Sequence, residues 1–389
     1  MKYTTLIYFR YIPLTAKIWS DFYMKAVMDA GLHVEYWDLS RLFFRDSWGQ
    51  EDASSLLEDY VRRFNNYAAF EACIQQQDID STLFVSLVSY DYQVTKLFRL
   101  FTKYNCQLAV FGRNMFPRSS YVDRSVLQRL MSLSPTKIIR FYRNRRAIHW
   151  KETGKIRGYD VIFQGGSLGY KGIGCVSRTE IERAQSVKVN SNDYDTYLQI
   201  RTLPSHQDEK YIVFLDEYLP LHPDAKLFKI QTIAPEVYYR EINTYFSRLE
   251  AQYGMSVVIA AHPKALKYKE CNYFCGRHVE FGRSAELVRG AEFVLAHNST
   301  SIAFAVAFRK RLHLLTSHTL ERDMAYVHRH ILDEASFLGC NWQYVDEESP
   351  VLVAEVDDSR YNQYKYDYLC WPETENLETK DLVIEFLKK

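Results

Sequence analysis

Three chemically active residues follow one apolar run in the sequence. His262, Pro263 and Lys264 come directly after the run at 257–261, so the pattern places them at the carboxyl end of a buried strand. Pro263 has a fixed φ and biases His262 towards an extended conformation. A held imidazole can donate a hydrogen bond to a phosphate or protonate a leaving oxygen, and the Lys264 ammonium adds positive charge. A lone histidine is more often structural, but this order at a strand end favours His262 as a catalytic residue beside a bound phosphate.

A second apolar run, at 293–296, also ends in polar residues. Five of them are candidate donor-binding residues together with Pro263 and Lys264: His297, Asn298, Ser299, Thr300 and Ser301. The hydroxyls open a predicted helix, where unpaired N–H groups and side-chain donors can bind phosphate. Such residues begin many helices, so the motif is informative mainly in combination with the His-Pro-Lys run. In a parallel sheet both groups lie on one rim and can hold the same phosphate.

Acidic residues supply the candidate bases. Asp216 and Glu217 end the apolar run at 211–215, and either of them can act as a general base. The alternative is that the pair only solvates and caps the loop. His222 and Asp224 lie on the same loop.

Two further acidic patterns are less specific. Glu286 follows Ser284, the expected N-cap of a helix, and either interacts with the helix dipole or accepts hydrogen bonds from ribose hydroxyls. Asp193-Tyr194-Asp195 has the spacing of a metal-binding D-x-D motif, but its position between the two halves favours a linker.

The rest of the pattern predicts the elements that position these residues. With 389 residues the chain is expected to form two domains. Strands alternate with helices in both halves, including a helix over 54–76, and this order predicts βαβ units in parallel sheets. We therefore predict an α/β fold of two Rossmann-like, doubly wound domains facing each other across a cleft. The expected boundaries are 1–185, 186–370 and a C-terminal helical segment, 371–389, that packs back on the first domain.

These motifs together resemble a known family. Leloir glycosyltransferases of the GT-B fold that use CMP-activated sugars carry an acidic motif, a His-Pro motif and a Ser/Thr motif. They include bacterial sialyl-, polysialyl- and Kdo-type transferases of surface polysaccharide synthesis. The corresponding residues here are 216–217, 262–263 and 299–301, and the resemblance covers mainly 210–316. The sequence departs from the family at Tyr218, where the acidic motif usually ends in glycine.

The resemblance implies roles for the residues. His262 would contact the donor phosphate and act as an acid towards the leaving nucleotide, and the Ser/Thr motif would bind the same phosphate. An acid would deprotonate the acceptor hydroxyl. Because of the departure at Tyr218, Asp38 or Asp91 of the first half is an alternative to the 216–217 pair. The nucleotide sugar is a substrate, and no cofactor or bound metal is expected.

The first half is expected to bind the acceptor, a glycan or glycolipid. Arg113, Asn114 and Arg118 follow the strand predicted at 107–112 and are the candidate acceptor-binding residues, with ordinary loop residues as the alternative. The sequence does not specify the donor sugar, the acceptor or the stereochemical outcome.

The charge of the sequence limits which classes of partner are expected. A net charge of +1 gives no argument for a nucleic-acid partner. The basic segment 137–151 predicts either a solvated helix or loop face or a patch for anionic lipid headgroups. No secretory signal and no uncharged apolar stretch of roughly 18 residues is present, and the seven cysteines are scattered. We expect a cytoplasmic protein that works at the inner face of the membrane.

Two other functions fit the same residues. One is a transferase of similar architecture that uses a UDP-sugar or a polyol phosphate. The other is a non-catalytic partner protein encoded in a polysaccharide locus, which would bind no nucleotide.

Overall fold

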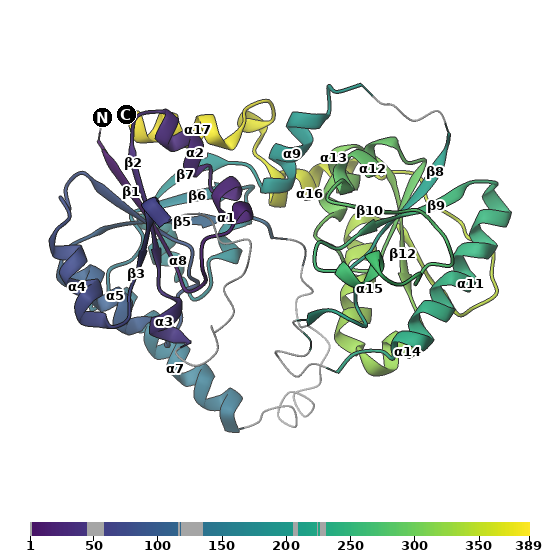
Figure 1. The fold of residues 1–389 in the computed structure, drawn as a ribbon, viewed down its shortest axis with the longest axis horizontal. Coiled ribbons are helices and arrows are strands. Elements are labelled where there is room, and N and C mark those ends of the chain that lie inside the picture. The colour runs from purple at the N-terminus through teal and green to yellow at the C-terminus, as the bar shows by residue number, and fades with distance from the viewer. Residues whose placement is uncertain are drawn as a thin grey trace. The chain divides into compact units, whose positions relative to one another are not determined.

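A computed structural model describes residues 2–44, 58–115, 117, 135–204, 209–223, 225 and 231–389. The chain divides into two compact units (Figure 1). The first is built from the chain up to Asn192 together with Cys370–Lys389, and the second mainly from Asp193–Leu369. Each unit contains one parallel sheet with helices on both faces, so the predicted pair of Rossmann-like, doubly wound α/β domains is confirmed.

The first unit holds a seven-stranded sheet of order β3-β2-β1-β4-β5-β6-β7. Its strands are β1 Thr5–Arg10, β2 His33–Asp38, β3 Val61–Arg63, β4 Thr82–Ser86, β5 Gln107–Gly112, β6 Val161–Gly165 and β7 Gln185–Val189. Its helices are α1 Ala16–Asp21, α2 Met24–Asp29, α3 Ser40–Phe43, α4 Tyr67–Gln75, α5 Thr95–Lys103, α7 Pro135–Glu152, α8 Arg178–Arg183 and α17 Thr379–Lys388. All strand pairs are parallel, which explains why the central strands are apolar along their whole length.

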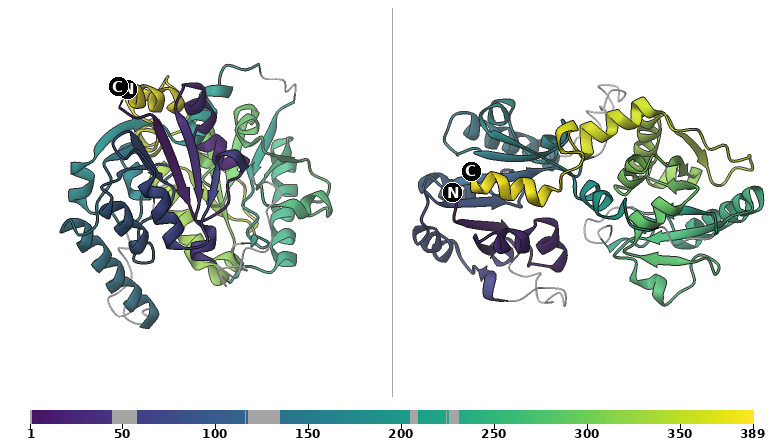
Figure 2. Two further views of the ribbon diagram at one scale, coloured as in Figure 1. Left: turned by 60° about the vertical axis from the view of Figure 1, so that its left-hand side comes forward. Right: turned by 90° about the horizontal axis from the view of Figure 1, so that it is seen from above.

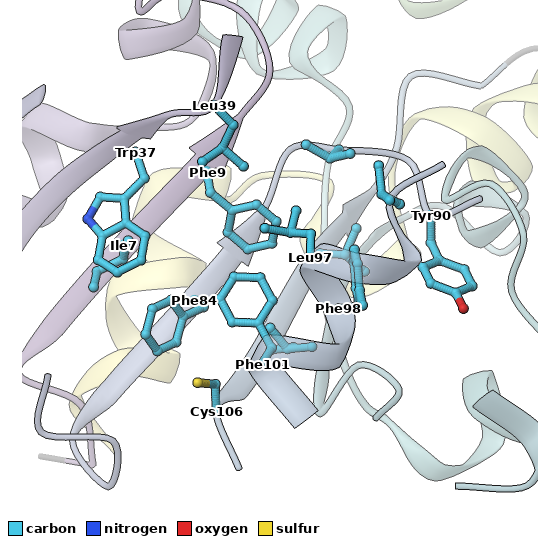
Figure 3. Close-up of a cluster of buried hydrophobic side chains, with 14 of the residues drawn as sticks. Ile7, Phe9, Trp37, Leu39, Phe84, Tyr90, Leu97, Phe98, Phe101 and Cys106 are labelled. Carbon is cyan, nitrogen blue, oxygen red and sulfur yellow. The ribbon is translucent and has the colours of Figure 1, made fainter. Parts of the chain in front are cut away.

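Aromatic side chains dominate the core on one face of this sheet. Figure 3 shows Trp37 from β2 beside Phe84 from β4, with Phe9 and Phe101 close by. The Trp37 ring lies edge-on to Phe84 with centroids 5.6 Å apart, and Phe9 lies 4.8 Å from Phe101. Edge-to-face packing of this kind adds to the burial of apolar area. The core therefore fixes the register of the sheet from which the loops of the first unit emerge.

The C-terminal segment belongs to the first unit. Helix α17 packs against α2 and β7, and Figure 2 shows it in yellow beside the N-terminal strand. The amide of Asn190 donates to the carbonyl of Leu377 at 2.7 Å, and the backbone N–H of Asn190 donates to the Thr379 hydroxyl at 2.9 Å. These contacts attach the end of the chain to the edge of the first sheet.

The second unit holds a six-stranded sheet of order β10-β9-β8-β11-β12-β13. Its strands are β8 Tyr211–Leu215, β9 Ser256–Ala261, β10 Val279–Phe281, β11 Phe293–Ala296, β12 Arg311–Thr316 and β13 Asn341–Tyr344. The helices are α9 Asn192–Ile200, α11 Pro235–Tyr253, α12 Ser284–Gly290, α13 Ile302–Ala307, α14 His318–Asp323, α15 Ala325–Leu338 and α16 Asp358–Tyr364. Helix α11 begins with a proline at its first turn and ends at Gly254, whose φ of 64° suits glycine.

The structure corrects three sequence expectations about elements. Of the helix predicted over 54–76, residues 54–57 lie outside the described residues, 61–63 form the edge strand β3, and α4 begins only after the Asn66 cap. Strand β7 extends the first sheet beyond the predicted boundary at 185. The presumed linker around Asp193 is helix α9.

Candidate functional site

The second sheet changes direction between β8 and β11. From β8 the chain moves to β9 and β10 on one side, and it returns to β11 on the other side of β8. In open α/β sheets, a crevice for ligands forms at such a switch point, beyond the carboxyl ends of the strands. The loops after β8, β9 and β11 carry the acidic, His-Pro and Ser/Thr motifs. The topology thus brings three segments, more than 80 residues apart at their extremes, to one edge.

A hollow of about 330 Å³ lies at this edge, and we call it the β8–β11 hollow. Its lining residues are Glu217, Leu219, His222, Ala225, Thr232, His262, Asn298, Ser299, Thr300, Met324 and Tyr326. Five of the predicted site residues are among them. All lie in the second unit, so the hollow is a property of that unit alone.

His262 is half-buried at the mouth of β9. The backbone N–H of Lys264 donates to its Nδ1 at 3.1 Å, so Nδ1 is an acceptor and the proton of a neutral ring lies on Nε2. The His222 ring stands 4.9 Å from it at an angle of 68°. A donor N–H and a second imidazole therefore lie at one side of the hollow.

Glu217 faces the same hollow from β8. Its Oε1 accepts a hydrogen bond from the backbone N–H of Asn298, which connects the two loops on either side of the switch point. Burial raises the pKa of Glu217 to about 8, with the Asn298 hydrogen bond opposing the shift and the nearby Asp216 adding to it. A carboxyl with this pKa can exchange a proton with a substrate near neutral pH.

Asp216 is not among the residues that line the hollow, and its role as a catalytic residue stays a prediction. Directly after the end of β8, Asp216 is buried, whereas Glu217 is half-buried and lines the hollow. Burial raises the pKa of Asp216 to about 7, although the N–H groups of Tyr218 and His262 and the Tyr268 hydroxyl act to lower it. With a pKa of about 7, the Asp216 carboxyl is mostly protonated and neutral at pH values below 7.

His297 lies in the core at the end of β11 and outside the lining of the hollow, so its role as a donor-binding residue stays a prediction. It is 1% exposed, and its Nδ1–H donates to the carbonyl of Leu315 at 2.7 Å. That assignment leaves Nε2 to accept a hydrogen bond from the Tyr238 hydroxyl at 3.0 Å. Burial lowers the pKa of His297 to about 4, so the ring is neutral and holds the end of β11 in place.

The other predicted donor-binding residues lie outside the lining of the hollow. Pro263 and Lys264 are exposed, and the backbone of Lys264 orients the His262 ring. Ser301 is half-buried and its N–H donates to the Ser299 hydroxyl at 3.3 Å. Glu286 is exposed in the first turn of α12, 4.0 Å from a guanidinium nitrogen of Arg283. Its neighbourhood suits an interaction with the helix dipole, and a contact with ribose stays a prediction.

Helix α12 begins differently from the expectation. Arg283 occupies its N-cap and Ser284 is the first helical residue, with no side-chain cap among the described residues.

Two of the residues predicted to bind the acceptor in the first unit form hydrogen bonds within that unit. Arg113 is 7% exposed and donates to the Tyr23 hydroxyl at 2.8 Å and to the carbonyl of Asp21, so its guanidinium braces the core, and a contact with an acceptor stays a prediction. Asn114 has φ of 59°, and its Oδ1 accepts from the N–H of Asn192 at 3.0 Å. Arg118 lies outside the described residues.

The two alternative bases of the first unit each accept a backbone hydrogen bond from a residue two positions later. Asp38 is 3% exposed and accepts from the N–H of Ser40 at 2.9 Å, and Asp91 accepts from the N–H of Gln93 at 2.8 Å. Both carboxyls thus stabilise turns.

Asp193 and Asp195 lie two residues apart in α9, so their side chains point in different directions. Within the ranges that the structure describes, no group of three His, Cys, Asp or Glu side chains is arranged to hold a metal ion. In the same ranges no helix is long and apolar enough to cross a bilayer.

Six of the lining residues were not among the predicted site residues, and two of these six carry aromatic rings. His222 stands against His262, and Tyr326 comes from the start of α15. A signal for His222 is present in the sequence, because His222-Pro223 repeats the His262-Pro263 dipeptide after the neighbouring strand. Tyr326 carries no such signal, since α15 reaches the hollow only through tertiary packing.

Comparisons with known proteins give similarity at the level of the fold. No protein-family model matches the chain, and no curated protein sequence matches it. Similar solved structures include the UDP-GlcNAc 2-epimerase of Methanocaldococcus jannaschii in complex with UDP-GlcNAc and UDP, at 12% identity and a TM-score of 0.45, covering 99% of each chain. A variant of the wall teichoic acid polymerase TagF is 10% identical, with a TM-score of 0.48, covering 99% of this chain and 89% of that one. The S. aureus MnaA–UDP complex is 12% identical, with a TM-score of 0.40, covering 85% and 91%. Similarity at this level does not identify a reaction or a ligand.

Proposed function

We propose that the chain is a glycosyltransferase that moves a sugar from a nucleotide-activated donor to a hydroxyl of a glycan or glycolipid acceptor. The observation that carries the proposal is the convergence of His262, Glu217, Ser299 and Thr300 on one hollow at the switch point of the second sheet. Hydrogen-bond donors and an acid–base pair in one crevice are what transfer from a phosphate ester requires.

The donor phosphate would lie against His262 and the two hydroxyls. The Nδ1 of His262 accepts from the Lys264 N–H, so the Nε2–H of the neutral ring is the group that would donate to a phosphate oxygen. Ser299 and Thr300 add rotatable O–H donors. As the bond between the anomeric carbon and the phosphate oxygen breaks, both electrons of that bond stay on the oxygen. A hydrogen bond or proton from His262 would stabilise the charge that develops there.

Glu217 would act as the general base. In its deprotonated form it can take the proton of the acceptor hydroxyl while the hydroxyl oxygen forms a bond to the anomeric carbon. The pKa of about 8 means that activity should rise as the pH increases towards that value. The main-chain hydrogen bond from Asn298 would hold the carboxyl in place during this step.

We infer further that the donor is CMP-linked, carrying a nonulosonic or ulosonic acid. This part of the proposal is supported by the resemblance of the acidic, His-Pro and Ser/Thr motifs to CMP-sugar transferases. The second imidazole, His222, favours one competing donor class, because two rings 4.9 Å apart can both contact a phosphoryl group, as a polyol-phosphate donor would require.

Nucleotide binding tests the proposal and separates the donors. The melting temperature of the chain is measured with CMP, CDP, UDP and GDP, since a ligand at about 100 times its Kd adds about 2.7 kcal/mol to stability. We expect CMP to give the largest shift in the wild type and a much smaller one in His262→Ala. The matched control is His278→Ala, because His278 is an exposed histidine of the same unit that pairs with Glu280.

Turnover is then measured against a panel of nucleotide sugars and CDP-polyols. A larger shift with UDP, with hydrolysis of UDP-sugars, would replace the CMP assignment but retain the transferase. A chain that binds none of the four nucleotides and hydrolyses no donor would contradict the proposal and favour the non-catalytic partner.

A further inference from the structure

Helix α7 of the first unit, Pro135–Glu152, carries exposed apolar side chains that its own unit does not cover. Ile138, Ile139, Phe141 and Tyr142 are 38%, 50%, 60% and 68% exposed. Figures 1 and 2 show the N-terminal end of this helix projecting away from the sheet of the first unit. Large apolar side chains clustered on one exposed element mark an interaction surface.

Contacts with the rest of the unit show which face of α7 is turned inwards, and the opposite face is then the outer one. Ala147 is buried and its carbonyl accepts from the Tyr90 hydroxyl at 2.9 Å, while Lys151 is buried in an ion pair with Glu180 at 2.6 Å. The side chain of Asn144 accepts from the N–H of Tyr92 at 3.2 Å. Residues 144, 147 and 151 therefore form the face that is attached to the unit.

The opposite face combines apolar and basic residues. At 100° per residue, Ile138 and Tyr142 point away from the attached face, and Arg145, Arg146 and His149 continue the same stripe one to two turns later. All five of these side chains are exposed. Apolar side chains at one end and guanidinium groups along the rest are typical of a helix that lies on a membrane surface.

Charge determines the kind of partner. Between residues 135 and 150, which leaves out the paired Lys151, the sequence has five lysines and arginines and no acidic residue, whereas the whole chain carries a net charge of only +1. The excess is therefore local to this helix. Exposed isoleucines would remain in water against a nucleic-acid backbone, but they can enter the boundary between lipid headgroups and acyl chains.

We propose that residues 138–149 of α7 form a docking surface for an anionic lipid bilayer, which we call the α7 surface. Arg145 and Arg146 would contact lipid phosphates while Phe141, Tyr142 and the neighbouring isoleucines enter the interface. The proposal rests on these residues alone and is independent of the reaction assigned to the second unit.

Sedimentation with vesicles tests the α7 surface on the full chain. One set of vesicles contains equal parts of phosphatidylcholine and phosphatidylglycerol, and the other contains phosphatidylcholine only. We expect binding to the anionic vesicles that weakens with added salt and is much weaker on the neutral ones. Arg145→Gln combined with Arg146→Gln should reduce the binding about tenfold or more. Phe141→Ser combined with Tyr142→Ser should reduce it while the net charge stays the same.

Two matched controls separate this surface from general charge and hydrophobicity. Lys25→Gln with Arg178→Gln removes two cations that are 73% and 93% exposed elsewhere in the first unit. Leu352→Ser removes an apolar side chain that is 70% exposed in the second unit. Both controls should bind like the wild type. Thermal melting checks that each variant folds, which we expect because every substituted side chain is exposed.

A fluorescence measurement reports on insertion directly. Phe141→Trp should shift its emission to shorter wavelength on anionic vesicles, and Leu352→Trp should not. Equal binding to both kinds of vesicle, equal losses in the controls or no blue shift at position 141 would overturn the proposal. Binding to single-stranded RNA that needs Arg145 and Arg146 but not Phe141, without vesicle binding, would also overturn it and assign the surface to nucleic acid.

Discussion

The two sheets reverse direction in the same way, but the residues at the two reversals differ in kind. In the first unit the reversal lies between β1 and β4. There, hydrogen bonds to main-chain carbonyls connect and close the loops after the strands. The N–H of Leu87 donates to the carbonyl of Phe9 at 3.1 Å, and the Ser86 hydroxyl donates to the carbonyl of Val88 at 2.9 Å. The ring of Tyr11 packs 6.0 Å from that of Phe43.

At the reversal of the second unit, side chains with protons to exchange take these places. Glu217 bridges to the neighbouring loop, and His262 and His222 stand beside the hydroxyls of Ser299 and Thr300. Both sheets therefore have the same kind of reversal, and at the second one the described side chains include a carboxyl and two imidazoles. Function is read from the residues at the crevice, since the fold alone does not specify it.

The largest expected effect is a loss of kcat/KM on substitution at the reversal of the second unit but not in the first unit. His262→Ala should lower kcat/KM by about 10²–10⁴-fold, because it removes a general acid or phosphate donor at the reacting centre. Asp91→Asn, which changes an acid of the first unit that caps a turn, should leave kcat/KM near the wild-type value. Steady-state kinetics with the donor identified by nucleotide binding measures both. A severe loss in Asp91→Asn with normal turnover in His262→Ala would place the chemistry in the first unit.

A second prediction concerns the aromatic core that holds the first sheet. Trp37→Ala should lower the free energy of unfolding by about 3–5 kcal/mol, since a fully buried indole packed on Phe64, Phe70 and Phe84 leaves a cavity. Chemical denaturation measures the loss. The nucleotide-induced shift in melting temperature should persist where the protein is folded, because the hollow belongs to the second unit. Leu352→Ala, on the surface, is the control and should change stability little.

The sequence predicts the strands and their ends better than it predicts where individual side chains point. Apolar runs end at β8, β9 and β11 as expected, so His262, Glu217 and Ser299 meet at one edge. The adjacent acids could not be told apart, because which of two neighbours faces the core depends on the register of β8 against β9 and β11.

Two other predicted site residues show the same limit. Arg113 is held by partners about 90 residues away in sequence, the Tyr23 hydroxyl and the Asp21 carbonyl. His297 is held by Tyr238 and Leu315 from two other elements. Local sequence shows that a polar residue follows a strand, but tertiary partners decide whether it reaches the crevice or braces the core.

A third prediction uses pH to compare two buried acids, Asp216 of the second unit and Asp38 of the first. Asp216 has a pKa of about 7 in the folded chain, raised from 3.8 chiefly by burial, so between these values the folded state binds a proton that the unfolded state has lost. Stability contributed by the protonated form is therefore present below about pH 4 and is lost as the pH rises through about 7. Asp216→Asn keeps a neutral side chain, so its stability relative to the wild type should rise from about pH 4 to pH 8 by on the order of 4 kcal/mol.

Denaturant titrations at several pH values measure this difference. The matched variant is Asp38→Asn, because Asp38 is also buried but accepts a backbone hydrogen bond and lies 3.6 Å from Arg63. We expect it to lose stability rather than gain it at pH 8. A flat difference between Asp216→Asn and the wild type would mean that the Asp216 carboxyl is charged in the folded chain.

The smallest expected effect tests how the hydroxyls divide the work with His262. Thr300→Ala should weaken nucleotide binding by about 5–20-fold, the loss of one hydrogen bond to a charged phosphate. The side chain is exposed, so the substitution should not affect folding. Thr300→Ser should restore binding because it restores the hydroxyl, and Thr319→Ala, whose hydroxyl donates to Glu241 at 3.0 Å, should leave binding unchanged. Isothermal titration with the nucleotide measures all three. If Thr300→Ala binds like the wild type, the phosphate lies on the imidazole side of the hollow, between His262 and His222, and the second reversal would use its two histidines rather than its helix-opening hydroxyls to hold the ligand.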